Sequence, residues 1–215
     1  MTLHVCTWWW GTRYGPEYVQ RLRAGVYRNL TAMYQWHVYN PEPEDIHLTS
    51  IPGCFCRLRA FDPIWQQRNG IRPGDRLVCM DLDSIVTGPL FDLFDTDEEF
   101  KILEGANGPS HPCRFNGSIW MLRGGTRHDV WTDFSLEAAG KLPKHTFPDD
   151  QGWFDFKFPD VTGWKVGAAS GIYAYEKRGW PGGNDLPKDA RLVVFPGSRD
   201  PSGFTHLSWV KKHWC

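Results

Sequence analysis

The pattern of apolar and polar positions in the first forty residues predicts a strand, a helix and a second strand. Residues 3–7, LHVCT, are typical of a short strand, and the fixed φ angle of Pro16 suits the first turn of a following helix. Four apolar residues at spacings of three and four give this helix one apolar face: Val19, Leu22, Val26 and Leu30. Residues 35–39 alternate as a second strand, and prolines within residues 40–43 end it.

A continuous apolar run within residues 76–80 predicts a central strand, because a strand covered on both faces has no need of polar positions. A turn at residues 72–75 precedes this strand. The remaining expected elements are a short helix at 58–65, strands at 100–103, 118–122 and 192–195, a helix at 129–139 and a glycine-rich loop at 163–183. Strands that alternate with helices predict an α/β fold, with a mostly parallel or mixed central sheet flanked by helices.

Length and composition favour a single domain over residues 1–215. Of the 215 residues, 41% are hydrophobic and 23% are charged, which is typical of a globular chain that buries a sizeable core. The 12 tryptophans exceed ordinary usage, and filling the core explains most of them, although flat indole faces also stack on sugars and bases.

Charge, cysteines and apolar runs argue against several other classes of protein. A net charge of -1 does not suit a protein that coats a nucleic-acid backbone. The six cysteines form no Cys-x-x-Cys zinc pair and are sparse for a small secreted scaffold, so we expect reduced thiols. No apolar stretch approaches the roughly 20 residues that span a bilayer, and the first residues carry no basic leader. We therefore expect a cytoplasmic protein.

Asp81 and Asp83 are the strongest candidates for chemistry. They follow the central strand directly and stand two residues apart, so the pleat directs both carboxylates to one side. Carboxylate oxygens suit Mg or Mn, and such an ion can bridge to a diphosphate. The alternative is that both aspartates cap a turn through their own backbone. Capping explains one aspartate, but it gives no reason for two carboxylates that repel each other unless a cation is present.

The neighbourhood of these aspartates resembles a known family. Residues 79–94, CMDLDSIVTGPLFDLF, resemble the Asp-x-Asp region of glycosyltransferases with the GT-A fold, and the pattern is similar to that of the glycogenin-like nucleotide-diphospho-sugar transferases. Four further segments follow the family's order: WGTRYG at 10–15, RLRAFD at 57–62, FNGS at 115–118 and DQGW at 150–153. The resemblance covers most of the chain. It implies one GT-A-like domain, with a nucleotide-binding half over about residues 1–95 and an acceptor and sugar half over about residues 96–215.

The resemblance also implies roles for individual residues. Asp81, Asp83 and a divalent Mn or Mg ion would hold the diphosphate of the donor, and Asp150 with Gln151 would face the reacting centre. The implied substrate-binding residues are Thr7, Trp8, Arg13, Tyr14, Arg57, Asn116, Ser118 and Trp153. Arg57 stands where the family often has Lys, and the guanidinium adds bidentate geometry to the positive charge.

Several of these positions have a plain structural explanation as well. Asn116 could shape a turn, Asp150 could cap a helix together with Asp149, and Arg13 could lie on the surface. The three tryptophans at residues 8–10 cannot all face the core, because neighbouring strand residues point to opposite sides. At least one of them is expected near a pocket or a loop.

The chain departs from the family at the third metal ligand. Relatives commonly supply a His before a Gly on a late strand, but here Pro196 precedes Gly197 and has no ligating side chain. His206 and Asp200 follow in the same terminal segment, and we expect one of them to reach the metal if this segment closes over the nucleotide. The alternative is that water or the diphosphate completes the coordination shell.

The predicted activity is metal-dependent transfer of a hexosyl or pentosyl group from a nucleotide-diphosphate donor, a UDP-sugar first, to a hydroxyl acceptor. A metal and nearby arginines would stabilise the charge on the leaving diphosphate. Asp150 would orient the acceptor or stabilise an oxocarbenium-like transition state. The resemblance leans towards retention at the anomeric carbon. The acceptor stays open between a glycan, a protein, a small molecule and a modified nucleic-acid base.

Three other functions compete with this prediction. A haloacid-dehalogenase-like phosphatase also carries Asp-x-Asp after a strand, but its motif usually opens the fold, and Ser84 stands where it has Gly. A sugar nucleotidyltransferase would need a Gly-rich loop after the first strand, which is not found here. A lectin-like module explains the tryptophans but leaves the paired aspartates without a role unless they bind Ca.

Overall fold

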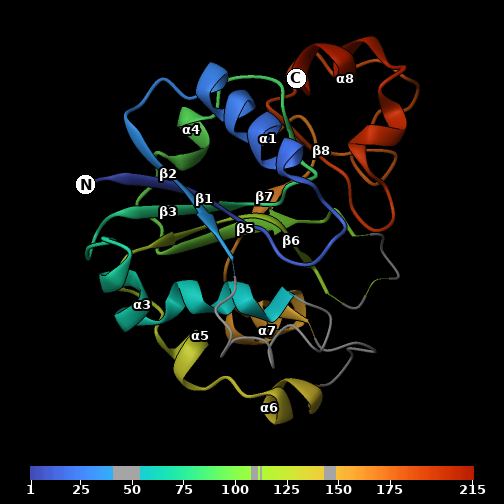
Figure 1. Cartoon of the computed structure of the whole chain (residues 1–215). Coiled ribbons are helices and arrows are strands. Elements are labelled where there is room, and N and C mark those ends of the chain that lie inside the picture. Colours follow the sequence, from blue (N-terminus) through green and yellow to red (C-terminus); the bar gives the residue numbers. More distant parts are fainter. Residues whose placement is uncertain (41–53, 108–110, 112, 143–148) are drawn as a thin grey trace.

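The structure, a computed structural model, describes residues 1–40, 54–107, 111, 113–142 and 149–215 (Figure 1). Its main sheet has six strands in the order β2-β1-β3-β6-β5-β7. These strands are β1 (Leu3–Trp8), β2 (Tyr34–Tyr39), β3 (Arg76–Met80), β5 (Phe100–Glu104), β6 (Phe115–Arg123) and β7 (Trp164–Lys165). β1 runs parallel to β2 and β3, whereas β6 is antiparallel to β3 and β5. The sheet is therefore mixed, as the sequence predicts.

A second sheet of three short strands lies beside the main one. It has the order β4-β9-β8, formed by β4 (Ile85–Val86), β9 (Leu192–Val194) and β8 (Ile172–Ala174). Because β4 follows β3 closely and β9 comes from the last part of the chain, this sheet brings the C-terminal segment next to the residues that follow β3.

Helices cover both faces of the main sheet. They are α1 (Pro16–Asn29), η2 (Cys54–Phe61), α3 (Pro63–Arg68), α4 (Phe91–Phe94), α5 (Asp129–Thr132), α6 (Leu136–Gly140), α7 (Asp150–Lys157), η3 (Pro201–Phe204) and α8 (Ser208–His213). In Figure 1, α1, α4 and α8 lie above the sheet, and α3, α5, α6 and α7 lie below it.

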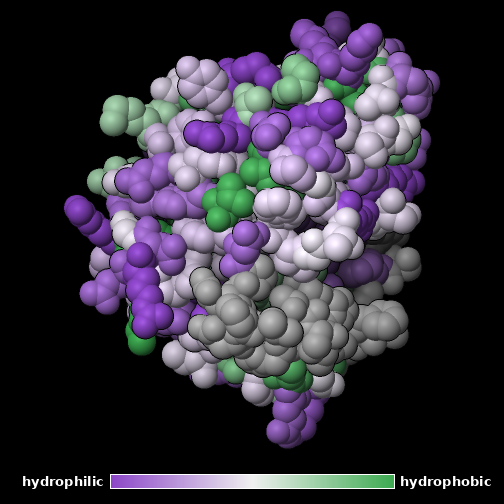
Figure 2. All heavy atoms as spheres, in the orientation of Figure 1, coloured by the Kyte–Doolittle hydropathy of each residue, from purple (hydrophilic) through white to green (hydrophobic). Residues whose placement is uncertain are grey.

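Two hydrophobic cores lie between the main sheet and its helices, one on each face. The upper core takes Val78 and Met80 from β3, and the lower core takes Leu77 and Cys79 from the same strand. Both faces of β3 are thus buried, which is why its sequence is apolar without alternation. On the face seen in Figure 2, hydrophilic residues predominate and hydrophobic ones form small separate patches.

The structure confirms the early strands and the first helix. Helix α1 begins at Pro16, and Leu22, Val26 and Leu30 bury the expected apolar face. Within the described parts of the chain, no helix combines the length and apolar composition that crossing a membrane requires. The two halves predicted around residue 95 stay a prediction.

Other boundaries differ from the sequence prediction. The helix expected at 58–65 is divided between η2 and α3, because Pro63 starts a new helix that the Asp62 side chain caps. The helix expected at 129–139 is likewise two short helices, the second capped by Ser135. The glycine-rich loop contains β7 and β8. Strand β6 begins three residues earlier than predicted, which moves Asn116 from a turn onto a strand.

Candidate active site

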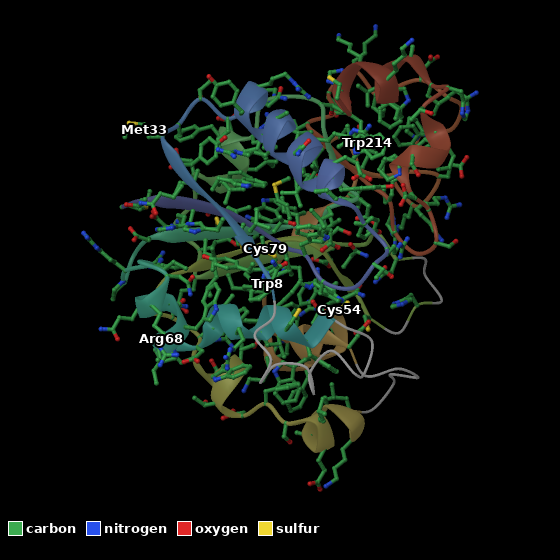
Figure 3. The ribbon with its side chains drawn as sticks, viewed as in Figure 1. Trp8, Met33, Cys54, Arg68, Cys79 and Trp214 are labelled. Carbon is green, nitrogen blue, oxygen red and sulfur yellow. The ribbon has the colours of Figure 1, made fainter. Side chains whose placement is uncertain are left out.

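A cavity of about 240 Å³ opens at the carboxyl ends of β1 and β3. This is the edge at which open α/β sheets bind ligands. Most of the predicted site residues line it, namely Trp8, Arg13, Tyr14, Arg57, Asp81, Asp83, Asn116, Ser118 and Gln151. Figure 3 labels two lining residues, Trp8 at the end of β1 and Cys54 at the start of η2 below the main sheet.

Asp81 and Asp83 project from the turn that ends β3. The backbone N–H of Asp81 donates to the carbonyl of Ser118 on β6 at 2.9 Å, which holds the turn against the neighbouring strand. Leu82, between the aspartates, is 3% exposed and packs in the upper core. Asp81, Leu82 and Asp83 all line the cavity. Tyr14 donates its hydroxyl to Oδ2 of Asp83 at 2.8 Å.

The two carboxylates are costly to ionise in this position. Burial raises the pKa of Asp83 to about 7, and the charge of Asp81 adds to the shift. Burial also raises the pKa of Asp81, against the opposing effect of Arg57. Burial and the neighbouring Asp83 carboxylate raise the pKa of the Tyr14 hydroxyl. A cation bound between the carboxylates would relieve their repulsion and favour their charged forms.

Arg57 is buried between two carboxylates. It is 3% exposed, and its Nη1 donates to Oδ1 of Asp81 and to the carbonyl of Gly117, the latter at 3.0 Å. Its Nε lies 2.8 Å from Oδ2 of Asp150. Burial alone would lower the pKa of Arg57, but the Asp150 and Asp81 carboxylates raise it well above its ordinary value. The guanidinium expected to bind the diphosphate is therefore already paired within the protein.

Asp149 and Asp150 have different roles at the start of α7: Asp149 caps the helix, and Asp150 pairs with Arg57. Asp149 is the N-cap and accepts from the backbone N–H of Gly152 at 3.0 Å. The carboxylate of Asp150 is fully buried against Arg57 rather than open to the cavity, and burial raises its pKa to about 7. Gln151, next in the chain, lines the cavity. Of the two predicted catalytic residues, Gln151 is the one open to a ligand in this structure.

A small polar network forms the wall near Asn116. The Asn116 side chain donates to Oδ1 of Asn107 at 3.2 Å and accepts from the backbone N–H of Ser118 at 3.0 Å. Asn107 also donates to Oε1 of Gln151 at 3.4 Å, so it joins β6 to α7. Sequence reasoning missed Asn107, because no motif marks it and its partner Gln151 lies 44 residues further along the chain.

Besides Asp150, three predicted residues do not line the cavity. Thr7 has a fully buried side chain on β1, and Trp153 belongs to the lower core, where its indole N–H donates to the carbonyl of Val130 at 2.8 Å. His206 is exposed in the segment between η3 and α8. Trp153 is two positions after Gln151 on α7, and side chains two positions apart on a helix point to different sides. Gln151 therefore lines the cavity while Trp153 faces the lower core.

The C-terminal segment reaches the cavity through other residues. Pro196 and Gly197 line it, and Nη2 of Arg13 approaches the carbonyls of Gly197 and Arg199, each at 3.4 Å. Asp200, the alternative third ligand, instead caps η3. The residues nearest the cavity in this segment thus carry no ligating side chain.

The three adjacent tryptophans serve different purposes. Trp8 and Trp10 line the cavity, whereas Trp9 donates its indole N–H to the carbonyl of Tyr14 at 2.8 Å and thereby shapes the loop after β1. The prediction that at least one tryptophan lies near a pocket is confirmed. Cys54, Leu82 and Phe195 also line the cavity, although no sequence pattern pointed to them.

No group of three His, Cys, Asp or Glu side chains gathers for metal binding among the residues that the structure describes. Asp81 and Asp83 line the cavity together with Cys54, but the three do not gather as a metal-binding group.

Comparison with known proteins gives a likeness of fold. No family model matches the sequence, and no curated protein matches it. Among solved structures, a glycosyltransferase involved in the glycosylation of the major capsid of PBCV-1 is 15% identical, with a TM-score of 0.58 over 96% of this chain and 98% of that one. The apo form of the glycosyltransferase GlyE from Streptococcus pneumoniae TIGR4 is 12% identical, with a TM-score of 0.61 over 99% of this chain and 63% of that one.

The galactosyltransferase LgtC, in complex with donor and acceptor sugar analogs, is 9% identical, with a TM-score of 0.56 over 100% of this chain and 97% of that one. All of these neighbours are glycosyltransferases, and at such identities the likeness is one of architecture. The chain therefore has the GT-A glycosyltransferase fold that its motifs predicted.

Proposed function

We propose that this protein is a glycosyltransferase that moves a sugar from a nucleotide-diphosphate donor to a hydroxyl acceptor, with the cavity at the end of β3 as its donor site. The observation that carries the proposal is the meeting of Asp81 and Asp83 with the buried Arg57 and Asp150 at one edge of a sheet with this fold. Paired carboxylates at such an edge suit a metal-bound diphosphate better than a sugar alone.

The charges near the cavity support a divalent cation as part of the site. Arg13 and Arg57 contribute two positive charges, while Asp81, Asp83 and the adjoining Asp150 contribute three negative charges when ionised. The balance is then -1, which repels a diphosphate. A divalent ion would change it to +1.

Asp81 and Asp83 would hold this ion, Mn or Mg, and their raised pKa values fit a site that gains from a bound cation. When bound, the ion supplies positive charge to the diphosphate oxygens and stabilises the leaving group. Oxygen atoms of the donor and water would complete the shell in place of a third side chain. Asp200 and His206 have no part in this proposal.

The other lining residues include aromatic and polar side chains. Trp10 offers aromatic surface for a base or a sugar ring, whereas Trp8 is 5% exposed and its ring stacks on Trp65. Arg13, which is exposed, can pair with a phosphate. Asn116 and Gln151 present amide groups that suit sugar hydroxyls. We propose a UDP-sugar as the first donor to test and either a hexosyl or a pentosyl group as the sugar. The acceptor stays open, and a cytoplasmic location stays a prediction.

A thermal-shift screen of nucleotide sugars, each with and without Mn, tests the proposal directly. A ligand present at about 100 times its Kd stabilises a fold by about 2.7 kcal/mol. We expect stabilisation by at least one nucleoside-diphosphate sugar only when Mn is present, and no such gain in Asp83→Asn. The matching free sugar and a generic phosphomonoester serve as controls.

Two results would contradict the proposal. Stabilisation by the free sugar alone, without any response to nucleotides, would favour the lectin-like function. Hydrolysis of the phosphomonoester, with no binding of nucleotide sugars, would favour the phosphatase.

A further inference from the structure

We propose that Arg57 and Asp150 form a positioning pair that holds the carboxylate of Asp81. This inference rests on the proposed function, and it assigns these two residues a role other than the one their motifs imply. Its basis is a continuous chain of contacts, from Asp150 on α7 through Arg57 on η2 to Asp81 after β3.

The geometry uses the shape of the guanidinium as well as its charge. Nη1 of Arg57 reaches Asp81 and the carbonyl of Gly117, while Nε on another edge of the same plane faces Asp150. The two contacts of Nη1 are hydrogen bonds, whereas the contact of Nε with Asp150 is an ion pair without hydrogen-bond geometry. A planar guanidinium holds these acceptors in a fixed arrangement, whereas a lysine ammonium is a point charge on a flexible stem. The contact with Asp81 involves Oδ1 only, so Arg57 orients this carboxylate through one of its two oxygens.

Burial shows why the pair suits positioning better than ligand contact. Asp150 is fully buried and Arg57 is 3% exposed, so both charges are largely withdrawn from water. A buried charge that loses its partner is strongly unfavourable, and each member therefore holds the other in place. A ligand that displaced Arg57 from Asp150 would leave this buried carboxylate without its counter-charge.

Gly117 on β6 provides independent support for the pairing, because its lack of a side chain leaves room for Arg57 and Asp150. A Cβ at position 117 would lie 2.9 Å from Nη2 of Arg57 and 3.2 Å from Oδ2 of Asp150. Gly117 is not among the glycines with positive φ, so its backbone conformation does not require glycine. Space for the guanidinium and the carboxylate is the requirement that remains. Strand β6 thus leaves the space that the side chains of Arg57 and Asp150 occupy.

A double-mutant cycle on thermal stability, measured in EDTA without substrate, tests the pairing. Arg57→Met should lower the Tm markedly, because it leaves Asp150 buried without a counter-charge. Adding Asp150→Asn in the same chain should recover part of the loss, so that Arg57→Met/Asp150→Asn melts above Arg57→Met. A double variant whose loss of Tm equals the sum of the two single losses would overturn the pairing. This measurement does not depend on any activity and decides the pairing even if the proposed function is wrong.

Turnover then tests the positioning role. Arg57→Lys keeps the charge and should fold, yet it loses the planar guanidinium, so we expect kcat to fall at least tenfold while the KM for the donor changes less than threefold. Arg59→Lys, in the same 3-10 helix with its guanidinium over the ring of Trp131, is the matched control and should keep wild-type kinetics.

A double-mutant cycle of Arg57 and Asp150, measured on kcat, distinguishes a joint positioning role from independent contacts with the substrate. If Arg57 and Asp150 act as one unit, the double variant should be no slower than the slower single variant. Losses that multiply in the double variant, or wild-type kcat in Arg57→Lys, would overturn the inference. If donor and Mn stabilise the wild type but no transfer occurs, the proposed function is refuted. The stability cycle then decides the pairing of Arg57 with Asp150 by itself.

Discussion

Replacing Asp83 by Asn should stabilise the metal-free protein while removing its response to metal. The substitution takes away one of two neighbouring carboxylates that burial and mutual repulsion make costly to ionise. Asn keeps an acceptor oxygen for the hydroxyl of Tyr14, so the hydrogen bond to that side chain can persist. A purely structural aspartate would behave in the opposite way, because its loss would lower stability.

The structure sets the size of the effect. A pKa of about 7 against the ordinary 3.8 corresponds to a cost of at most about 4 kcal/mol when Asp83 is fully ionised. Asp83 is only partly buried by its accessible surface, and solvent screening reduces this cost, so we expect about 1–2 kcal/mol. For a chain of this length, that gain raises the Tm by about 2–8 °C.

The pH dependence gives a second signature of the same group. The folded pKa of Asp83 lies above its unfolded value, so the folded state binds the proton more tightly. Its contribution therefore favours folding at low pH, and stability is lost as pH rises between 3.8 and about 7. The Tm advantage of Asp83→Asn should be largest at pH 8 and small near pH 4.

Differential scanning calorimetry in EDTA and in Mn, at both pH values, measures all of these effects. Asp92→Asn is the matched control, because Asp92 forms an exposed ion pair with Arg191 at 3.3 Å, and such pairs contribute about 0–1 kcal/mol. A lower Tm for Asp83→Asn in EDTA at pH 8, together with an undiminished Mn shift, would refute the reasoning.

Three further substitutions test the remaining assignments. Asp150→Asn should reduce kcat at least tenfold with less than a threefold change in donor affinity, as calorimetry and initial rates will measure; an unchanged kcat would leave Asp150 with a folding role only. Trp153→Ala should cost about 3–5 kcal/mol in chemical denaturation, since its ring fills the lower core, whereas a loss of donor affinity at normal stability would return it to the site. His206→Ala should keep the wild-type Mn affinity in a calorimetric titration, because the side chain is exposed away from the cavity; a clear loss would make it a ligand after all.

Several elements could be predicted because their signals are local. The apolar run of β3 reports burial on both faces, and Pro16 marks the first turn of α1 whatever packs against it. The position of Asp81 and Asp83 directly after this strand likewise predicted that both lie at its carboxyl end, where they line one cavity. Each of these conclusions depends on neighbours within a few residues in the chain.

The partners of the candidate site residues depended on distant parts of the chain. Nothing local shows that Arg57 meets Asp150, which lies far along the sequence, or that Gly117 leaves the space for both. The sequence also could not show that Trp153 faces the core or that the C-terminal segment presents Pro196 and Gly197 to the cavity.

The sequence by itself thus determined the α/β order of elements and the strand end that carries the paired carboxylates. Tertiary structure alone decided how the charges beside them are paired. The physical reason is that periodicity and backbone restriction act between neighbours in the chain, whereas the pairing of buried charges depends on which side chains the folded sheet and helices bring within contact distance.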